Sequence, residues 1–299
     1  MKKQELFIKA PAKINLSLLL TGRRADGYHL ISSVMQLVSL YDTITIQKRT
    51  ASGIEIITES PLIPCGEKNT CYKAAASYFK TAGIDNAGIS INIKKMIPES
   101  AGLAGGSSDA AAVIKGLERI YGAFEGDHRK LNEIALSIGA DVPFCMNYLS
   151  SCCICEGIGE IMTPVSRNKQ MTKIYAVIAK KTRGLSTPSV YARYDALNKP
   201  ATSERDAKLH AEMLAHAVSE GEPRDIAALL KNELYEAAIC IKPEIACLIG
   251  SMMSLGALGA SMSGSGSAVF GIFPNIKTAK QCESILRADR ITAYCVRFI

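Results

Sequence analysis

The sequence has no tryptophan and no long unbroken run of apolar residues. A membrane-spanning helix needs about 18 consecutive apolar residues, and no segment reaches that length. Near the start of the chain, Glu5, Lys9 and Lys13 interrupt the apolar residues, which argues against a signal peptide. We therefore expect a cytoplasmic protein that does not associate with a membrane.

The cysteine pattern does not favour a metal or redox site. The tightest group is Cys152, Cys153 and Cys155, and no histidine lies near it. The remaining cysteines are scattered in apolar contexts, as Cys240 is between two isoleucines. This pattern is typical of reduced, buried thiols rather than of disulfides or a metal centre.

The charge pattern lacks the clusters that nucleic-acid-binding proteins show. The formal net charge is +7, yet lysines and arginines are dispersed among acidic residues, and no basic run contains interleaved aromatics. We expect no nucleic-acid partner, whereas a basic cleft for a polyanionic small substrate fits the charge. The length of 299 residues suggests two domains or one large one.

Hydrophobic periodicity predicts a mixture of strands and helices without strict alternation. Strands are expected at 6–20, 43–47, 53–58, 89–97, 152–155, 173–181 and 292–299, with 43–47 and 53–58 as a pair. Helices are expected at 69–82, 128–138, 205–219, 224–239, 278–288 and after a glycine-rich segment. This order predicts an α+β fold rather than a doubly wound sheet. We place a domain boundary in the polar stretch 163–172, which gives domains at 1–165 and 166–299.

The densest functional signal is the segment PESAGLAGGSSDAAA at 98–112. Gly102, Gly105 and Gly106 fall within five positions, and two serines and an aspartate follow. Glycine allows a positive φ and a close approach of the backbone to a ligand, while Ser and Asp are typical of N-caps and first turns. A loop of this kind before a helix presents N–H donors at the positive end of the helix dipole. We infer a loop that cradles phosphate.

This loop matches neither of the two commoner phosphate-binding patterns. The Walker motif requires Gly-Lys-Ser/Thr, and no lysine lies between Pro98 and Lys115. The dinucleotide fingerprint requires Gly-x-Gly-x-x-Gly, which Gly102–Gly106 does not fit. The alternative is a tight turn that caps an ordinary helix, for which one glycine would suffice.

Two charged residues outside the loop are candidates for catalysis. Asp141 follows Gly139 and Ala140 and precedes a Val-Pro pair, so a rigid backbone suits it to a general base and equally to a structural turn. Lys13 alternates with apolar residues along the first strand and therefore shares a face with Asn15. A strand lysine is usually a solvated edge residue.

Several motifs together resemble one known superfamily. The segments at 98–112, 262–271 (MSGSGSAVFG) and 10–18 (APAKINLSL) resemble the phosphate loop, C-terminal glycine loop and first-strand motif of the galactokinase, homoserine kinase, mevalonate kinase and phosphomevalonate kinase superfamily. The segments RRADGYHLI at 23–31, GADVPF at 139–144 and the stretch from Ser186 to Tyr191 are similar to one family within it, the 4-diphosphocytidyl-2-C-methyl-D-erythritol kinases.

The resemblance implies a fold, a reaction and a cofactor. The fold would be the two-domain α+β kinase fold of the superfamily, with a ribosomal-protein-S5-like N-terminal domain and a ferredoxin-like C-terminal domain. The reaction would be ATP-dependent phosphorylation of the 2-hydroxyl of 4-diphosphocytidyl-2-C-methyl-D-erythritol, on the methylerythritol phosphate route to isoprenoid precursors. Mg²⁺ would accompany ATP.

The resemblance also assigns roles to individual residues. Lys13 and Asp141 would form the catalytic pair, in which Lys13 stabilises developing negative charge. Asn15 would lie near the methylerythritol hydroxyls, and the cytidine site would contain Tyr28, His29 and Tyr191. The residues expected to bind ATP are Pro98, Glu99, Ser100, Ala101, Gly102, Leu103, Ala104, Gly105, Gly106, Ser107, Ser108 and Asn69, beside a C-terminal glycine loop of Gly264, Ser265 and Gly266. Ser108 is the candidate protein ligand for magnesium.

Two other functions remain open from the sequence. A kinase of the homoserine or mevalonate type would share the loop motifs but has no need of RRADGYH at 23–29. A non-catalytic nucleotide-binding sensor would be expected to lack Lys13 or Asp141. The loop departs from the family at Glu99 and Ser100, where a small apolar or glycine pair is usual. The implied partners are ATP and the cytidine-diphosphate-linked methylerythritol, and we expect a monomer or a weak homodimer.

Overall fold

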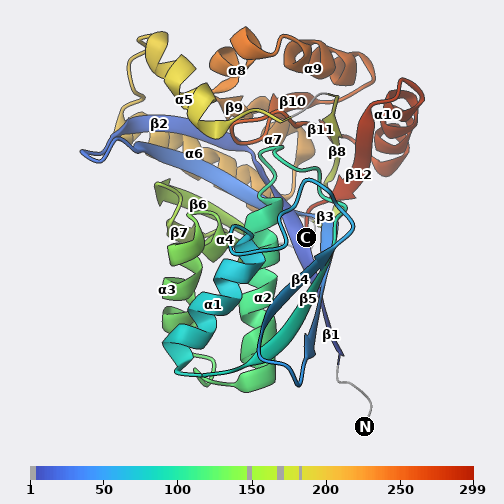
Figure 1. Cartoon of the computed structure of the whole chain (residues 1–299). Helices are drawn as coiled ribbons and strands as arrows, with labels where there is room; N and C mark the ends of the chain where they lie inside the picture. Colours follow the sequence, from blue (N-terminus) through green and yellow to red (C-terminus); the bar gives the residue numbers. More distant parts are fainter. Residues whose placement is uncertain (1–4, 147–149, 167–171, 182–183) are drawn as a thin grey trace. The chain divides into compact units, whose positions relative to one another are not determined.

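The computed structural model describes residues 5–146, 150–166, 172–181 and 184–299 (Figure 1). The chain divides into two compact units. The first comprises Met1–Ala12, Leu40–Ile97 and Ala104–Tyr148, and the second comprises Lys13–Ser39, Pro98–Leu103 and Leu149–Ile299. Strands β1 (Glu5–Asn15) and β3 (His29–Lys48) contribute residues to both units. Part of the stretch 163–172 lies outside the described residues, and the domain limits 1–165 and 166–299 stay a prediction.

The sheet of the first unit has β5 (Gly88–Lys94) between β4 (Gly53–Thr58) and the second half of β3. β5 runs parallel to β4 and antiparallel to β3, so that Ile91 lies opposite Ile56 on one side and Ile46 on the other. The expectation that 43–47 and 53–58 pair with each other is therefore wrong. β5 takes the central place because it buries alternate isoleucines, whereas β4 is largely exposed, as an edge strand is.

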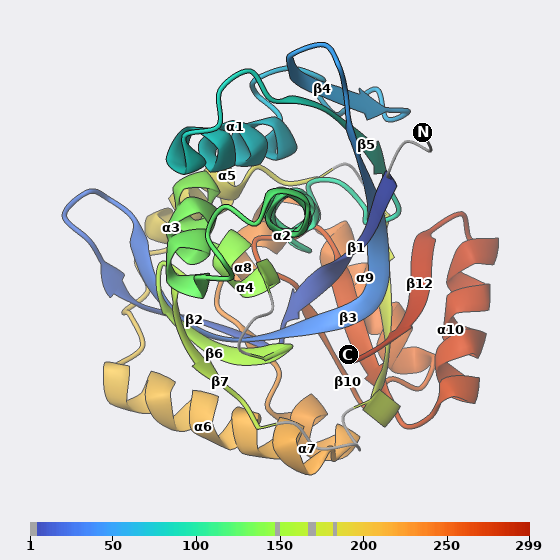
Figure 2. The same cartoon turned by 90° about the horizontal axis from the view of Figure 1, so that it is seen from below.

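Helices cover the core of the first unit. They are α1 (Thr70–Ala82), α2 (Gly105–Tyr121), α3 (His128–Ile138) and α4 (Val142–Met146). In both views α1, α2 and α3 lie side by side (Figure 1, Figure 2). The helices expected at 69–82 and 128–138 are confirmed, and the side chains of Asn69 and Asp127 cap their N-termini.

In the second unit, the first half of β3 pairs with β2 (Ser17–Arg23) and with β6 (Cys152–Gly157), both antiparallel. The strand β7 (Ile161–Pro164) extends the sheet from β6, and β9 (Lys231–Asn232) lies parallel to β2. The strand expected at 6–20 is divided at Leu16 into β1 and β2. The first half of β3 escaped prediction because it is buried on both faces and lacks the alternation of a half-exposed strand.

A four-stranded antiparallel sheet also belongs to the second unit. Its order is β10 (Gly259–Met262), β11 (Val269–Phe273), β8 (Tyr175–Lys180) and β12 (Thr292–Arg297). Helix α10 (Ile276–Ala288) connects β11 to β12 and packs on β8 and β12, while α9 (Glu244–Ser254) packs on β10 and β11. This is the arrangement of a ferredoxin-like βαββαβ unit, and it confirms the expected α+β class.

The connection between β8 and β10 carries most of the remaining helices. They are α5 (Thr187–Ala196), α6 (Glu204–Glu220), α7 (Pro223–Ala228) and α8 (Tyr235–Ile241). The helix expected at 205–219 is confirmed as α6, but the single helix expected at 224–239 is wrong. Asn232 interrupts it, because its Nδ2 donates to the carbonyl oxygens of Met262 and Gly264 at 2.7 and 2.9 Å.

The cysteines are free thiols, and most of them are buried as predicted. Cys240 is an exception, because α8 turns Ala237 and Ala238 inward and leaves the thiol exposed. Within the described residues, no single helix has the length and hydropathy to cross a membrane. Helices α8 and α9 meet that test only as a pair, and a bend of 116° separates them.

Candidate active site

The first part of the glycine-rich loop, Pro98–Leu103, belongs to the second unit. Protein donors bind several of its carbonyl oxygens: Lys180 Nζ binds Glu99 O, Ala268 N–H binds Ala101 O, Ser263 Oγ binds Gly102 O and Lys13 N–H binds Leu103 O. In a trans peptide, the N–H of the next residue points away from the carbonyl. The loop amides therefore point away from these donors, which leaves them available to bind an anion.

The two glycine loops of the chain touch within the second unit. Gly102 has a φ of +73°, and a Cβ there would lie 2.0 Å from the carbonyl oxygen of Ser263. Gly264 has a φ of +54°, and a Cβ there would lie 3.1 Å from Gly102 O. Ser265 Oγ forms a hydrogen bond with Thr187 Oγ1 at 2.8 Å. Only glycine fits at position 102, so the expected C-terminal glycine loop lies directly against the phosphate loop.

The second part of the loop begins α2 in the first unit. Ala104 is the N-cap residue, with a φ of +54° and no side-chain cap. Ser107 lies in the first turn, as expected, but no serine is the N-cap residue, because the chain is already helical from Gly105. Ser108 N–H donates to Ala104 O at 2.8 Å. The N–H groups of Gly105, Gly106 and Ser107 precede it and have no acceptor within the helix, which is the geometry of an anion site.

Two polar atoms beneath this turn are buried without a partner. Ser108 Oγ and Asp109 Oδ1 make no hydrogen bond within the described part of the chain. Both residues are almost fully enclosed, at 1% and 3% exposure. An unpaired buried hydroxyl costs free energy unless a ligand or water completes it. Ser108 Oγ is therefore available to an ion or to a phosphate oxygen.

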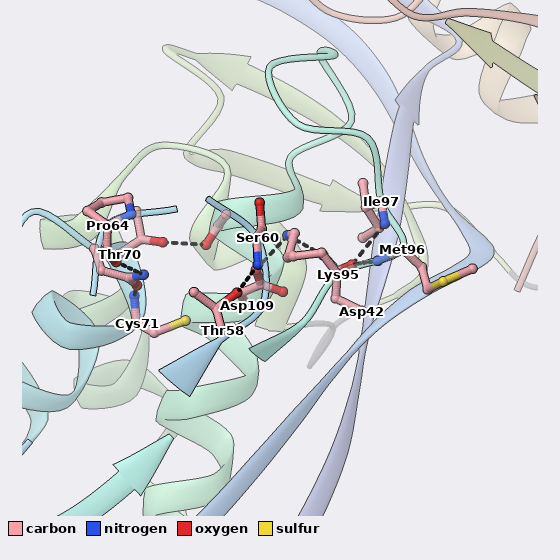
Figure 3. A network of polar contacts seen from close by, with 12 residues as sticks. Asp42, Thr58, Ser60, Pro64, Thr70, Cys71, Lys95, Met96, Ile97 and Asp109 are labelled. Atoms are coloured by element: carbon pink, nitrogen blue, oxygen red, sulfur yellow. Dashed lines mark hydrogen bonds and ion pairs between the residues drawn. The ribbon is translucent and has the colours of Figure 1, made fainter. Parts of the chain in front are cut away.

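A buried ion cluster supports the residues that lead into the loop (Figure 3). Lys95 Nζ donates to Asp109 Oδ2 at 2.7 Å and to Asp42 Oδ2. Asp42 Oδ1 accepts from the N–H groups of Met96 and Ile97 at 2.6 and 2.8 Å. Because these amides bind a carboxylate, β5 stops short of Ile97, which the sequence placed in a strand. Burial raises the pKa of Asp109 to about 7, against the opposing effect of Lys95.

Asn69 occupies the N-cap of α1 in the same unit. Its Oδ1 accepts from Cys71 N–H at 2.7 Å, and its Nδ2 donates to Pro64 O at 2.7 Å. The adjacent Thr70 Oγ1 donates to Gly106 O at 2.9 Å, which joins the start of α1 to the loop. The capping role is thus observed, whereas a contact of Asn69 with adenine stays a prediction.

Lys13 and Asn15 lie together on β1 in the second unit, as the alternation predicts. Lys13 Nζ donates to Asn15 Oδ1 at 2.6 Å, and Asn15 Nδ2 donates to Ser33 Oγ at 2.8 Å. Lys13 is buried, so it is not a solvated edge lysine. Asn15 N–H donates to Ser263 Oγ at 3.3 Å, and that hydroxyl donates to Gly102 O. Ser263, which the sequence analysis missed, therefore connects the lysine strand with the phosphate loop.

Asp141 lies in the first unit, directly before α4. Its carbonyl oxygen accepts from Cys145 N–H at 3.1 Å, so the helix fixes its backbone as predicted. At the other end of α4, Lys115 Nζ from α2 donates to Met146 O at 3.3 Å. Burial lowers the pKa of Lys115. Asp141 and Lys13 belong to different units, and their pairing stays a prediction.

Aromatic residues gather around His29 in the second unit. The ring of Tyr191 on α5 lies 4.9 Å from the His29 ring between centroids, at an interplanar angle of 32°. Tyr194 meets the same ring edge-on at 6.1 Å. Tyr28, which precedes His29, is 63% exposed. The structure thus brings together two of the three residues expected at the cytidine site and leaves Tyr28 at the surface.

Two charged residues join this group without having been predicted. His29 Nε2 lies 2.7 Å from Asp195 Oδ1, and Arg23 Nη1 lies 3.5 Å from Asp195 Oδ2. The spacing of Tyr191, Tyr194 and Asp195 at i, i+3 and i+4 marks one face of a helix. That signal was present in the sequence, but α5 itself was not predicted.

Comparison with known proteins places the chain among kinases. The model described as "GHMP kinases N terminal domain" matches residues 69–147, and "GHMP kinases C terminal" matches residues 214–290. The 4-diphosphocytidyl-2-C-methyl-D-erythritol kinase of Alkaliphilus metalliredigens (strain QYMF) is 40% identical over 277 residues, which cover 93% of this chain and 91% of that protein.

Solved structures show the same likeness. A crystal structure of 4-(cytidine 5'-diphospho)-2C-methyl-D-erythritol kinase is 33% identical with a TM-score of 0.79, over 98% of this chain and 99% of that one. A homoserine kinase from Cytophaga hutchinsonii has a TM-score of 0.73 at 18% identity, over 99% of this chain and 95% of that one. This second likeness shows the fold alone.

Proposed function

Because the chain belongs to the 4-diphosphocytidyl-2-C-methyl-D-erythritol kinase family of the GHMP kinases, we propose that it transfers the γ-phosphoryl group of ATP to the 2-hydroxyl of 4-diphosphocytidyl-2-C-methyl-D-erythritol. One observation in the structure carries the proposal. A continuous network leads from Lys13 through Asn15 and Ser263 to the carbonyl of Gly102 in the phosphate loop. A cation fixed beside a phosphate cradle suits phosphoryl transfer, in which positioning and charge stabilisation supply most of the catalysis.

The glycine loop has the role of holding the triphosphate. Its amides point away from the carbonyl partners, and the first turn of α2 adds the N–H groups of Gly105, Gly106 and Ser107. Lys13 stabilises the negative charge that develops on the transferred group. Asp141 orients the acceptor hydroxyl and accepts its proton. Proton transfer to a positioned base contributes about 10²–10⁴-fold to a rate.

Magnesium fits the chemistry of the loop. Ser108 Oγ is a buried oxygen without a protein partner, and oxygen atoms are the ligands that Mg²⁺ prefers. Within the described residues, no group of three or more His, Cys, Asp or Glu side chains is arranged to hold a metal. We therefore propose Ser108, together with ATP oxygens and water, as the site of the ion. Bound Mg²⁺ would neutralise charge on the phosphates.

The acceptor side of the site is proposed from the residues around His29 and from Asn15. His29 and Tyr191 would receive the cytosine ring, with Tyr28 closing over it, and Asn15 would lie near the methylerythritol hydroxyls. The partners are then small molecules, ATP and the cytidine-diphosphate-linked acceptor. We further propose a cytoplasmic monomer or weak homodimer.

The decisive experiment measures ADP release by the purified chain with Mg²⁺-ATP and candidate acceptors. Release is expected with 4-diphosphocytidyl-2-C-methyl-D-erythritol and not with homoserine or mevalonate. No release with the first acceptor, or equal release with all three, would contradict the proposal.

A substitution tests the assignment of the base. Asp141→Asn is expected to lower kcat by at least about 10²-fold while ATP binding changes little. Asp85→Asn is the matched control, because Asp85 is an exposed aspartate of the same unit. An Asp141→Asn variant that turns over at the control rate would refute the role of Asp141.

A further inference from the structure

The group around His29 contains one contact that the proposed reaction does not use. Asp195 Oδ1 lies 2.7 Å from His29 Nε2. The histidine side chain is only 10% exposed, whereas the side chain of Asp195 is 37% exposed. The second oxygen of Asp195 lies 3.5 Å from the guanidinium of Arg23. Arg23 Nε in turn donates to Gly27 O at 3.1 Å, in the turn between β2 and β3.

This contact decides which nitrogen of the ring carries the proton. A carboxylate only accepts hydrogen bonds, so the shared proton belongs to His29 Nε2. In the neutral ring the other nitrogen, Nδ1, is then an acceptor. Nδ1 makes no hydrogen bond to any residue in the described part of the chain, and it is not among the buried atoms that lack a partner. His29 therefore presents an acceptor outward.

The surroundings hold the ring in this orientation. Tyr191 lies across one face of the imidazole, and Tyr194 meets it edge-on. Both tyrosines and Asp195 come from the same face of α5. A ring held by two tyrosines and a carboxylate cannot turn over without breaking the Asp195 contact.

We propose that Asp195 is a positioning residue that keeps His29 in the Nε2–H tautomer and thereby makes the site select cytosine over uracil. The inference rests on the proposed function, since it concerns the base of the proposed acceptor. Cytosine carries an amino donor at position 4, whereas uracil carries a carbonyl oxygen there. An outward Nδ1 acceptor matches the amino group and opposes the carbonyl oxygen.

Asp195→Asn is the informative change because it keeps the shape of the side chain. An amide can donate to Nε2, which moves the ring proton to Nδ1 and produces the wrong tautomer. The donor Nδ1–H would then favour uracil. Asp195→Glu keeps an acceptor and is expected to restore part of the preference. Glu212→Gln on α6 is the matched control, since it exchanges an exposed carboxylate for an amide.

The experiment combines a spectrum with kinetics on the full-length chain. The nitrogen resonances of ¹⁵N-labelled histidine report the tautomer of His29, assigned by substituting the other three of the four histidines one at a time. We expect an Nε2–H ring in the wild type and an Nδ1–H ring in Asp195→Asn. We also expect Asp195→Asn to lower kcat/KM for the cytidine acceptor by about 10 to 100-fold while KM for ATP is unchanged. The ratio of kcat/KM for the cytidine acceptor to kcat/KM for its uridine-diphosphate analogue should fall by at least the same factor.

Several outcomes would overturn the inference. They are a wild-type ring with Nδ1 protonated, equal use of the two bases by the wild type, or an unchanged base preference in Asp195→Asn. The wild-type spectrum and base preference test the idea even if the variant does not fold. Failure of the proposed function has a different signature, namely no ADP release with either acceptor. In that case the relative binding of CDP and UDP to the wild type, measured by calorimetry, decides the inference.

Discussion

Lys95 forms ion pairs with two buried carboxylates, so Lys95→Met tests a buried electrostatic interaction of the first unit (Figure 3). The side chains of Lys95, Asp42 and Asp109 are 11%, 0% and 4% exposed. Burial alone would lower the pKa of Lys95, but the two carboxylates outweigh burial and raise it. The ammonium group is therefore charged at neutral pH, and Met would replace it by an uncharged side chain of similar length.

The two carboxylates do not depend on Lys95 equally. Asp42 keeps its hydrogen bonds from the N–H groups of Met96 and Ile97 when the ammonium group of Lys95 is removed. Asp109 loses its hydrogen bond from Lys95, and its other oxygen is already without a partner. Removing one partner of a buried ion pair costs about 3–5 kcal/mol. For a chain of this size that loss corresponds to a fall in Tm of about 6–10 °C.

Thermal unfolding of the wild type and three variants at one fixed pH measures this cost. Lys95→Met should show the full fall in Tm above pH 7, where Asp109 is ionised in the wild type, and Lys95→Met with Asp109→Asn should recover part of it, because the carboxyl that must either stay unpaired or take up a proton is gone. Lys208→Met is the control, since the exposed pair of Lys208 with Glu212 should contribute less than about 1 kcal/mol. A Lys95→Met variant as stable as the control, or a double variant without recovery, would refute the reasoning.

Three further changes test other parts of the structure. Ala104 has a φ of +54°, which strains a residue with a Cβ, so Ala104→Gly should stabilise the chain by about 1 kcal/mol. The Tm should rise while ATP turnover is retained. Gly102→Ala places a Cβ 2.0 Å from Ser263 O and should raise KM for ATP at least about tenfold; an unchanged KM would contradict the cradle. Burial lowers the pKa of His210 below its usual value of 6.5. The folded state therefore binds fewer protons than the unfolded state below pH 6.5, and stability is lost as the pH falls below that value. His210→Gln should therefore lose less Tm than the wild type on acidification, and equal losses would exclude His210 as the cause.

Elements with a clear period were predictable from the sequence. Helices α1 and α3 are amphipathic and begin at side-chain caps, so their limits were correct to within a residue. The first half of β3 was not predictable, since a strand buried on both faces has no alternation. The helix expected at 224–239 was broken by Asn232, whose partners lie about 30 residues away. Long-range hydrogen bonds of this kind leave no local pattern.

The residues of the candidate site were likewise predictable only where the signal lies within a short segment. The loop glycines and the shared face of Lys13 and Asn15 follow from spacing alone, because both express the geometry of a short segment. Ser263 and Asp195 were missed, since each acts through a residue more than 150 positions away. Neither residue stands out in the sequence, and the partner of each becomes apparent only in the folded structure.

Positions 99 and 100, where the sequence analysis expected a departure from the family pattern, show where such partners lie. Ser100 has a φ of +48°, a conformation in which a glycine would be unstrained. A Cβ at Gly184 would lie 2.2 Å from both the Cβ and the carbonyl oxygen of Ser100. Lys180, four residues earlier, binds Glu99 O. Ser100 is thus accommodated because Gly184 has no Cβ, and Lys180 holds the backbone at Glu99. Gly184 and Lys180 lie more than 80 residues away from these positions along the chain. A substitution at Gly184 would therefore displace the phosphate loop even though no motif includes it.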